Sequence, residues 1–103
     1  MSGVANPRGE MALAVAGAAV MLRPSFAALV KAEAELGPLF ALIERAADGK
    51  LTIGETVGLI WHCIHELPDG LTREALGEAL IEAGLARVTP VLKGLIGQIL
   101  KGR

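Results

Sequence analysis

The chain has 103 residues, enough for one small domain with a thin core. Ten basic and eleven acidic residues leave a net charge of −1, without the basic excess that binds a phosphate backbone, so no nucleic acid partner is expected. Its one cysteine cannot form an internal disulfide, and its aromatic residues are two Phe and one Trp. These features predict a fold that depends on aliphatic packing and suits a reducing cytoplasm.

Residues 1–9 are small and polar and are interrupted by proline and glycine, so we expect a flexible N-terminus followed by one domain over residues 10–103. The apolar run at residues 11–22 is about as long as the hydrophobic region of a signal peptide. Glu10 adjoins the run and no clean cleavage site follows, which favours a cytoplasmic protein. The run is also shorter than the ~20 residues that span a bilayer, so no membrane partner is expected.

A helix and a β-hairpin compete for residues 11–22. Ala, Leu and Met favour the helix, whereas Gly17 and the following Pro24 favour the hairpin, which we predict. A turn at Ala16-Gly17 places the large side chains on one face. The facing pairs are then Val15 with Ala18, Leu13 with Val20, and Met11 with Leu22. Because Ala16 is strained at positive φ, a three-residue loop with Gly17 left-handed is favoured.

The next segment predicts a helix from Phe26 to Leu36, capped by Ser25 and ended by Gly37. The side chains expected to point inward are Phe26, Leu29, Val30 and Leu36. Glu33 falls on the same stripe. It is either a buried carboxylate with a function or, as we favour, a partly exposed side chain paired with a neighbouring Arg or Lys.

Two further helices lie on either side of Gly49. Pro38 suits the first position of a helix that runs to Ala47. After Gly49, Thr52 and Glu55 fit a capping box that opens a helix over residues 52–67. The apolar stripe of that helix is Ile53, Val57, Ile60, Trp61, Ile64 and Leu67.

The last two helices meet near Gly84. Thr72 caps the first of them, which closes at Gly84 with Leu85 folding back. Thr89-Pro90 reads as a cap followed by a first-turn proline and opens the second. Its apolar face is Val91, Leu92, Leu95, Ile96, Ile99 and Leu100. The sequence therefore predicts an α+β, mainly helical fold, with an N-terminal β-hairpin followed by about five short helices in one compact domain.

Two groups of residues have side chains that bind metal ions, but neither group is complete. Residues 48–55, DGKLTIGE, match the second half of a calcium loop, yet the first and third ligand positions fall on Glu44 and Ala46. The other group is His62, Cys63, His65 and Glu66, and no further His or Cys exists to complete a zinc site. We expect no metal, with Glu55 acting as a helix cap and Cys63 buried as a small apolar residue.

No catalytic residue or cofactor is expected. Cys63 and His62 are sequence neighbours and would point about 100° apart on a helix, too far for a nucleophile and its base. Gly58, Gly77, Gly94 and Gly97 lie inside helical patterns. Each costs up to ~1 kcal/mol there, which indicates either a very close approach of another backbone or deliberately marginal helices. Both interpretations suit a protein that docks on partners.

The order of the segments resembles a known family. The segments are ANPRGEMALAVAG, LRPSFAALVKAEAELG, PLFALIERAADGKLTIGETVGLIWHCI, LTREALGEALIEAGL and the terminal QILKGR. Together they resemble the small tail-assembly proteins of gene transfer agents, which are phage-like particles of alphaproteobacteria. Such proteins are classed with phage tail-assembly chaperones and are sometimes labelled tail tube proteins. Relatives tend to carry a more polar turn than Ala16-Gly17, which leaves the hairpin's length open.

The resemblance implies a non-enzymatic protein that binds the long helical tape-measure protein before the tail tube polymerises around it, and is then displaced. One alternative is a structural tail component that self-associates, contacts other tail proteins and remains in the particle. A second is a metal-dependent regulatory helix-loop-helix domain. The candidate partner-binding residues lie on the C-terminal helix: Leu92, Leu95, Ile96 and Ile99. The same face could instead close the domain's own core, and roles for Glu33, His62 and His65 beyond structure stay open.

Overall fold

The computed structural model describes residues 11–15 and 18–102. The elements in chain order are β1 (Met11–Val15), β2 (Ala18–Leu22), α1 (Phe26–Leu36), α2 (Leu39–Ala47), α3 (Ile53–Cys63), β3 (Ile64–His65), α4 (Arg73–Ala83) and α5 (Leu85–Lys101). This order confirms the predicted α+β, mainly helical fold with an N-terminal hairpin. The predicted flexible segment at residues 1–9 lies outside the described residues.

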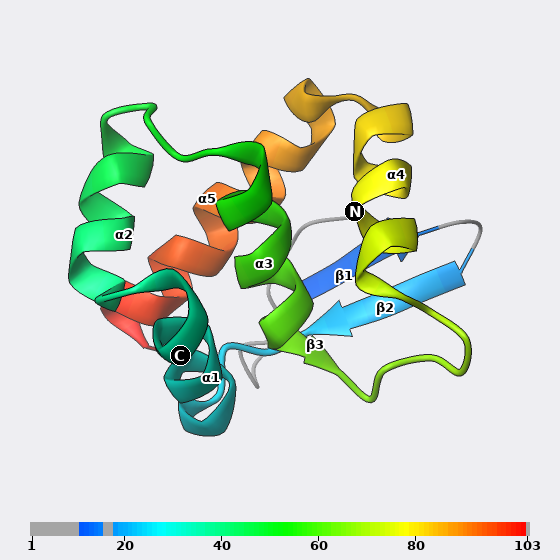
Figure 1. Ribbon diagram of the computed structural model, residues 1–103, viewed down its shortest axis with the longest axis horizontal. Helices are drawn as coiled ribbons and strands as arrows, with labels where there is room; N and C mark the ends of the chain where they lie inside the picture. The colour runs from blue at the N-terminus through cyan, green and yellow to red at the C-terminus, as the bar shows by residue number, and fades with distance from the viewer. Residues whose placement is uncertain (1–10, 16–17, 103) are drawn as a thin grey trace.

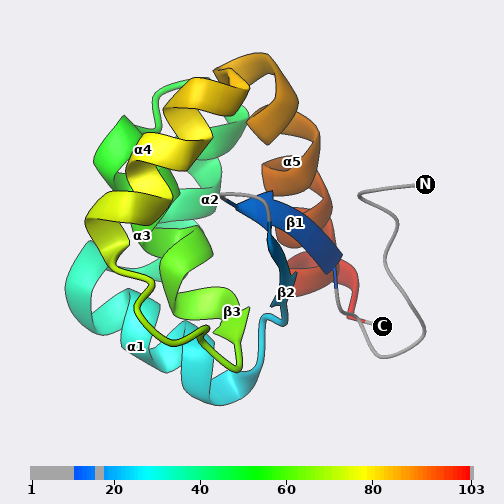
Figure 2. The same cartoon turned by 90° about the vertical axis from the view of Figure 1, so that its right-hand side faces the viewer.

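The helices gather around α3, which contacts both α1 and α4 (Figure 1). The hairpin lies beside this group, where β1 contacts α4 and α5. Figure 2 shows α1, α3 and α4 on one side of the hairpin, with α5 next to it. Among the described residues, no helix is both long enough and apolar enough to cross a membrane.

The hairpin pairs in the predicted register. The partners are Met11 with Leu22, Leu13 with Val20, and Val15 with Ala18. Of these side chains, Met11, Val15, Val20 and Leu22 are buried. Ala12, Ala14 and Ala19 are exposed, so successive side chains alternate between core and solvent as a pleated strand requires. The predicted loop at Ala16-Gly17 lies outside the part of the chain that the structure describes.

The helix α3 begins as predicted but ends four residues early. The capping box of Thr52 and Glu55 is present. The helix stops at Cys63, and the next two residues form β3, in which Ile64 lies opposite Leu22 and His65 opposite Met21. The predicted continuation to Leu67 is therefore wrong. Pairing with a strand from a distant part of the chain overrides the local helical pattern, as tertiary contacts commonly do.

The helix α1 turns a different face to the core than predicted. Its cap at Ser25 and its end at Gly37 are confirmed. Ala28 and Ala32 are buried, whereas Phe26 is 85% exposed and Val30 47% exposed. The predicted inward position of Phe26 and Val30 is therefore wrong. Because α1 packs on α3, small side chains at the contact let the two helices lie close together.

Two details at the helix ends also differ from the prediction. Glu33 is exposed and its Oε2 accepts a hydrogen bond of 2.9 Å from the backbone N–H of Leu39, so it caps the start of α2 instead of pairing with a cation. The helix α5 begins at Leu85, and Pro90 lies inside it. The missing N–H of Pro90 falls just past the first turn, and the Thr89 hydroxyl donates to the Leu85 carbonyl at 2.9 Å.

The tight contact between α1 and α3 yields the first test. Ala32→Leu adds bulk where the side chain is fully buried, so we expect it to destabilise the fold by about 1–3 kcal/mol. Ala27→Leu is the matched control, because Ala27 is exposed on the same helix and should change stability by less than ~0.5 kcal/mol. Urea unfolding followed by circular dichroism measures both. Equal stability of the two variants would contradict the assigned face of α1.

Candidate partner-binding groove

The helix α5 carries the predicted partner-binding residues, but these do not form one exposed surface. Leu95 is fully buried in the core. Leu92 and Ile99 are half-buried and pack against that core, and Ile96 is also half-buried. A partner cannot reach Leu95 in this fold, so the apolar stripe of α5 serves chiefly to close the domain.

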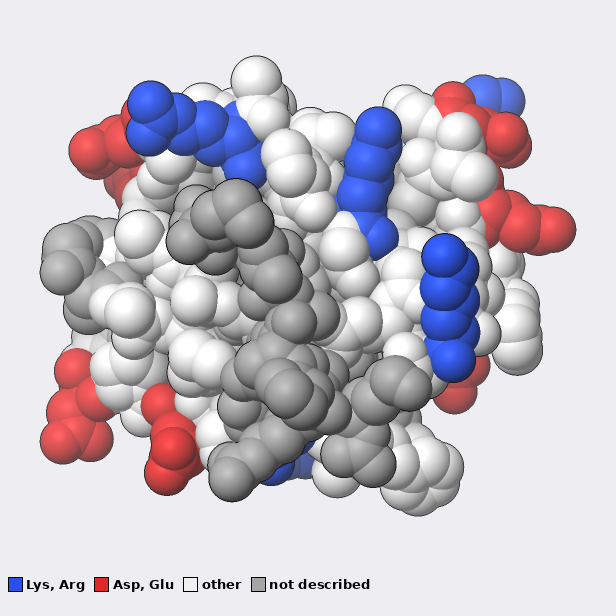
Figure 3. Space-filling view, turned by 180° about the vertical axis from the view of Figure 1, so that it is seen from behind, with Lys and Arg blue, Asp and Glu red and all other residues white. Residues whose placement is uncertain are grey.

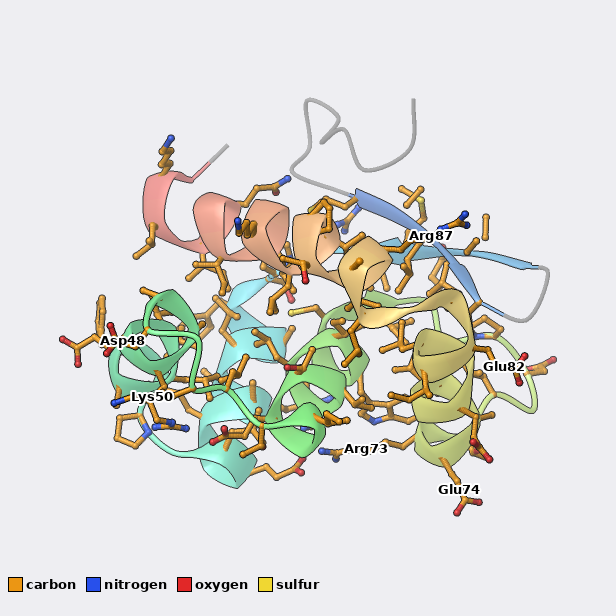
Figure 4. All side chains as sticks on the ribbon, turned by 90° about the horizontal axis from the view of Figure 1, so that it is seen from above. Asp48, Lys50, Arg73, Glu74, Glu82 and Arg87 are labelled. Atoms are coloured by element: carbon orange, nitrogen blue, oxygen red, sulfur yellow. The ribbon has the colours of Figure 1, made fainter. Side chains whose placement is uncertain are left out.

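An apolar groove opens between α3 and α5, and it is bounded at its ends by the loop after α2 and by the end of α4. Its volume is about 250 Å³. We name it the α3/α5 groove, and its apolar lining includes Leu51, Ile53, Leu80, Ile81, Leu85 and Leu92. Figure 4 views the molecule from this side, with α3 and α5 facing each other between α2 and α4. Of the four predicted binding residues, only Leu92 lines the groove.

The rim of the α3/α5 groove leaves large apolar side chains in contact with water. Ile53 is 54% exposed, Ile81 49% and Leu85 49%. Each lies at or near a helix end, so the three come together from separate parts of the chain. Apolar side chains that cluster around a hollow mark sites of association more often than scattered ones do. The sequence prediction placed Ile53 inward, left Leu85 at a turn and did not single out Ile81.

An ionic cluster lies elsewhere on the molecule and ties three helices together. Glu35 of α1 accepts two hydrogen bonds from Arg73 of α4, one of 2.7 Å from Nη1 and one of 2.5 Å from Nη2. Its Oε1 also lies 2.7 Å from His62 Nε2 of α3. The hydrogen bonds from Arg73 and then His62 lower the pKa of the Glu35 carboxyl from 4.5 to about 2. His62 therefore serves a structural contact, which sequence reasoning had left open.

Gly58 of α3 makes room for this cluster. A Cβ atom added at Gly58 would lie 2.5 Å from Arg73 Nη2 and 3.2 Å from Leu36 Cδ2. The Arg73 side chain points from α4 toward α3 (Figure 4). Gly94 of α5 plays a similar part, because an added Cβ would lie 2.5 Å from Met11 Cε. The atoms near both glycines belong to side chains, so the predicted close approach of another backbone is not what these glycines accommodate. An added Cβ at Gly97 would meet no atom of the described residues within 4 Å.

The residues considered for metal or acid–base chemistry have other contacts. The Oε1 atom of Glu55 accepts from the Thr52 backbone N–H at 3.0 Å, and its Oε2 pairs with Arg45. Hydrogen bonding to Thr52 and then Arg45 lowers the pKa of this carboxyl. His65 lies in β3, with Nε2 3.7 Å from Glu66. Within the described residues, no three His, Cys, Asp or Glu side chains are grouped to hold a metal ion.

Cys63 is buried at the junction of α3 and β3. Its side chain is 1% exposed, and burial raises the pKa of the thiol to about 12. The thiol therefore stays protonated at neutral pH and is a poor nucleophile. Its packing as a small apolar residue confirms the prediction.

The lowered pKa of Glu35 predicts a pH-dependent contribution to stability. A carboxyl with a lower pKa in the folded chain stabilises the fold above its unfolded pKa of 4.5 and loses this effect as the pH falls toward 2. We expect Glu35→Gln to lower the melting temperature at pH 7. The gap between variant and wild type should shrink from about pH 4.5 downward. A gap that stays constant to pH 2 in paired thermal scans would contradict this contact.

The burial of Leu95 predicts a stability effect before any binding effect. Leu95→Ala should destabilise the fold by about 2–5 kcal/mol, because it leaves a cavity in the core. Ile96→Ala, at a half-buried neighbour, should cost clearly less. Chemical denaturation measures both variants. A stable Leu95→Ala protein would instead place this side chain on a surface.

Residues 8–102 match the family model described as phage tail tube protein, GTA-gp10. No curated protein and no solved structure was found to match the chain. The family match confirms the resemblance to tail proteins of gene transfer agents, and the family description is that of a structural tail protein, not of an enzyme. The match spans nearly the whole sequence, so this chain belongs to the GTA-gp10 family of phage tail tube proteins.

Proposed function

We propose that the chain is a non-catalytic assembly chaperone that binds the tape-measure protein in the cytoplasm while the tail of a gene transfer agent is built. The α3/α5 groove is the observation that carries this proposal. Its apolar rim at Ile53, Ile81 and Leu85 is about half exposed, which is unfavourable in water unless a partner covers it. An elongated helical protein can supply that cover with an apolar helix face.

A structural role in the tail is the second candidate, and the family description favours it. The two roles differ in what happens after assembly. A chaperone leaves before the particle is complete, whereas a structural component remains in it in many copies. Both involve contacts with other tail proteins.

The two candidates are separated by following the chain through assembly. A tagged copy is expressed in host cells that produce particles, and complexes from the cells and finished particles are both analysed by mass spectrometry. For a chaperone, we expect the tape-measure protein to co-purify from cells, and the chain to be absent from particles. Stoichiometric presence in purified tails would support the structural role. If the tape-measure protein does not co-purify from cells and the chain is also absent from particles, both candidates are contradicted.

A further inference from the structure

The α3/α5 groove is lined mainly by apolar side chains, and its two hydroxyl groups are already used as donors. Its hydroxyl groups are those of Thr56 and Thr89. The Thr56 hydroxyl donates to the Thr52 carbonyl at 3.0 Å, and the Thr89 hydroxyl donates to the Leu85 carbonyl at 2.9 Å. Each hydroxyl has one proton, so neither can donate to a bound molecule without losing a bond within its own helix. The apolar lining therefore favours an occupant that presents apolar side chains.

Acidic residues of α4 lie next to Ile81 at the rim of the groove, although they line a separate hollow on α4 and not the groove itself. Ile81 lies on α4 between Glu78 and Glu82, and Glu74 continues the same row one turn earlier. In the part of the chain that the structure describes, none of these three glutamates makes a hydrogen bond or an ion pair. Like charges at a spacing of four residues destabilise a helix, so the row is unfavourable in the free protein. Figure 4 shows Glu74 and Glu82 projecting from α4 into solvent.

The single cation of α4 does not neutralise this row. The Arg73 guanidinium donates to Glu35 of α1 at 2.7 Å, so its charge is already paired with a carboxylate outside this row. A partner helix that crosses α4 over Ile81 would bring its flank next to Glu78 and Glu82. Lysine or arginine on that flank would relieve the repulsion and add ion pairs at the edge of the apolar contact.

A second copy of this chain fits the groove less well. Its α5 carries Arg87, Lys93 and Lys101 and no acidic residue. From behind, Lys and Arg side chains lie along the course of α5 (Figure 3). However, the apolar side chains of that helix are largely used by its own core, because Val88, Val91 and Leu95 are buried. The α5 helix of a second copy therefore has the positive charge that suits the glutamates, but it has no free apolar stripe to enter the groove.

From these observations we infer that the α3/α5 groove binds an amphipathic helix of another protein, whose apolar stripe is bordered by lysine or arginine. This inference rests on the proposed function, because it specifies which part of the long helical partner the groove takes. The apolar anchors of that helix recur at i, i+3, i+4 and i+7, and enter between α3 and α5. Its basic flank lies along α4.

Two synthetic helical peptides test the chemistry of the groove directly. Both carry the same leucine stripe, and one has lysine and the other glutamate along the flank. Fluorescence anisotropy with the full chain should show tighter binding of the lysine peptide, by roughly tenfold at low salt. The preference should fade as ionic strength rises, because exposed charges are screened.

Variants of the chain locate the site. Ile81→Glu should abolish binding of the lysine peptide, because it places a charge in the apolar contact. Val30→Glu on α1 is the matched control, since Val30 is 47% exposed and Ile81 49% exposed, and it should bind like wild type. The double variant Glu78→Lys with Glu82→Lys should reverse the preference in favour of the glutamate peptide. Circular dichroism checks that each variant is folded.

Several results would overturn the inference. Equal affinity for both peptides would contradict the inferred basic flank of the partner helix. Unchanged binding by Ile81→Glu would show that the groove is not the binding site. Binding of neither peptide, combined with self-association that Ile81→Glu abolishes, would assign the groove to a second copy. Binding of neither peptide without such self-association would remove helix docking altogether. Capture of the tape-measure protein by both wild type and Ile81→Glu would uphold the proposed function while rejecting this groove.

Discussion

The fold depends on the short pairing of β3 with β2. Ile64 and His65 lie opposite Leu22 and Met21, and the Arg23 N–H donates to the Cys63 carbonyl at 2.7 Å. These contacts join the end of α3 to the hairpin and supply partners for backbone groups at a buried helix end, where unpaired groups are costly. The chain then turns at Glu66, whose φ is 57°. Residues 66–72 then lead to α4, whose contacts with α3, α5 and β1 hold it where it contributes to the groove.

The two sides of α5 have different roles because of this arrangement. One side lies against the hairpin, where Gly94 leaves space for Met11, and Val91 and Leu95 fill the core. Val88 lies between the two sides, because it is buried and also lines the groove. The other side carries Leu85 and Leu92 into the α3/α5 groove. One helix thus closes the domain and also forms a wall of the binding surface, so mutations along it will affect folding or association according to the side they touch.

Local patterns were enough to predict the hairpin and most helix ends. The alternation from Met11 to Leu22 and the caps at Ser25, Thr52 and Thr72 act over a few residues, and each is present. The inward face of α1 could not be predicted in this way. Ala28 and Ala32 are four residues apart, and so are Phe26 and Val30, so the spacing alone does not show which pair faces the core. The small side chains face inward because α3 packs close to α1, and a contact between two separate helices cannot be predicted from the sequence of one of them.

The groove was beyond sequence reasoning for a related reason. Its rim joins Ile53, at the start of α3, to Ile81 and Leu85, near the junction of α4 and α5. The local pattern placed Ile53 on a core stripe and Leu85 at a turn, and it did not single out Ile81. Only the tertiary arrangement brings the three to one rim and leaves each about half exposed. A helix that ends at a rim cannot bury its last apolar residue against its own domain. Such ends are therefore where a small domain can retain an apolar surface for a partner without weakening its core.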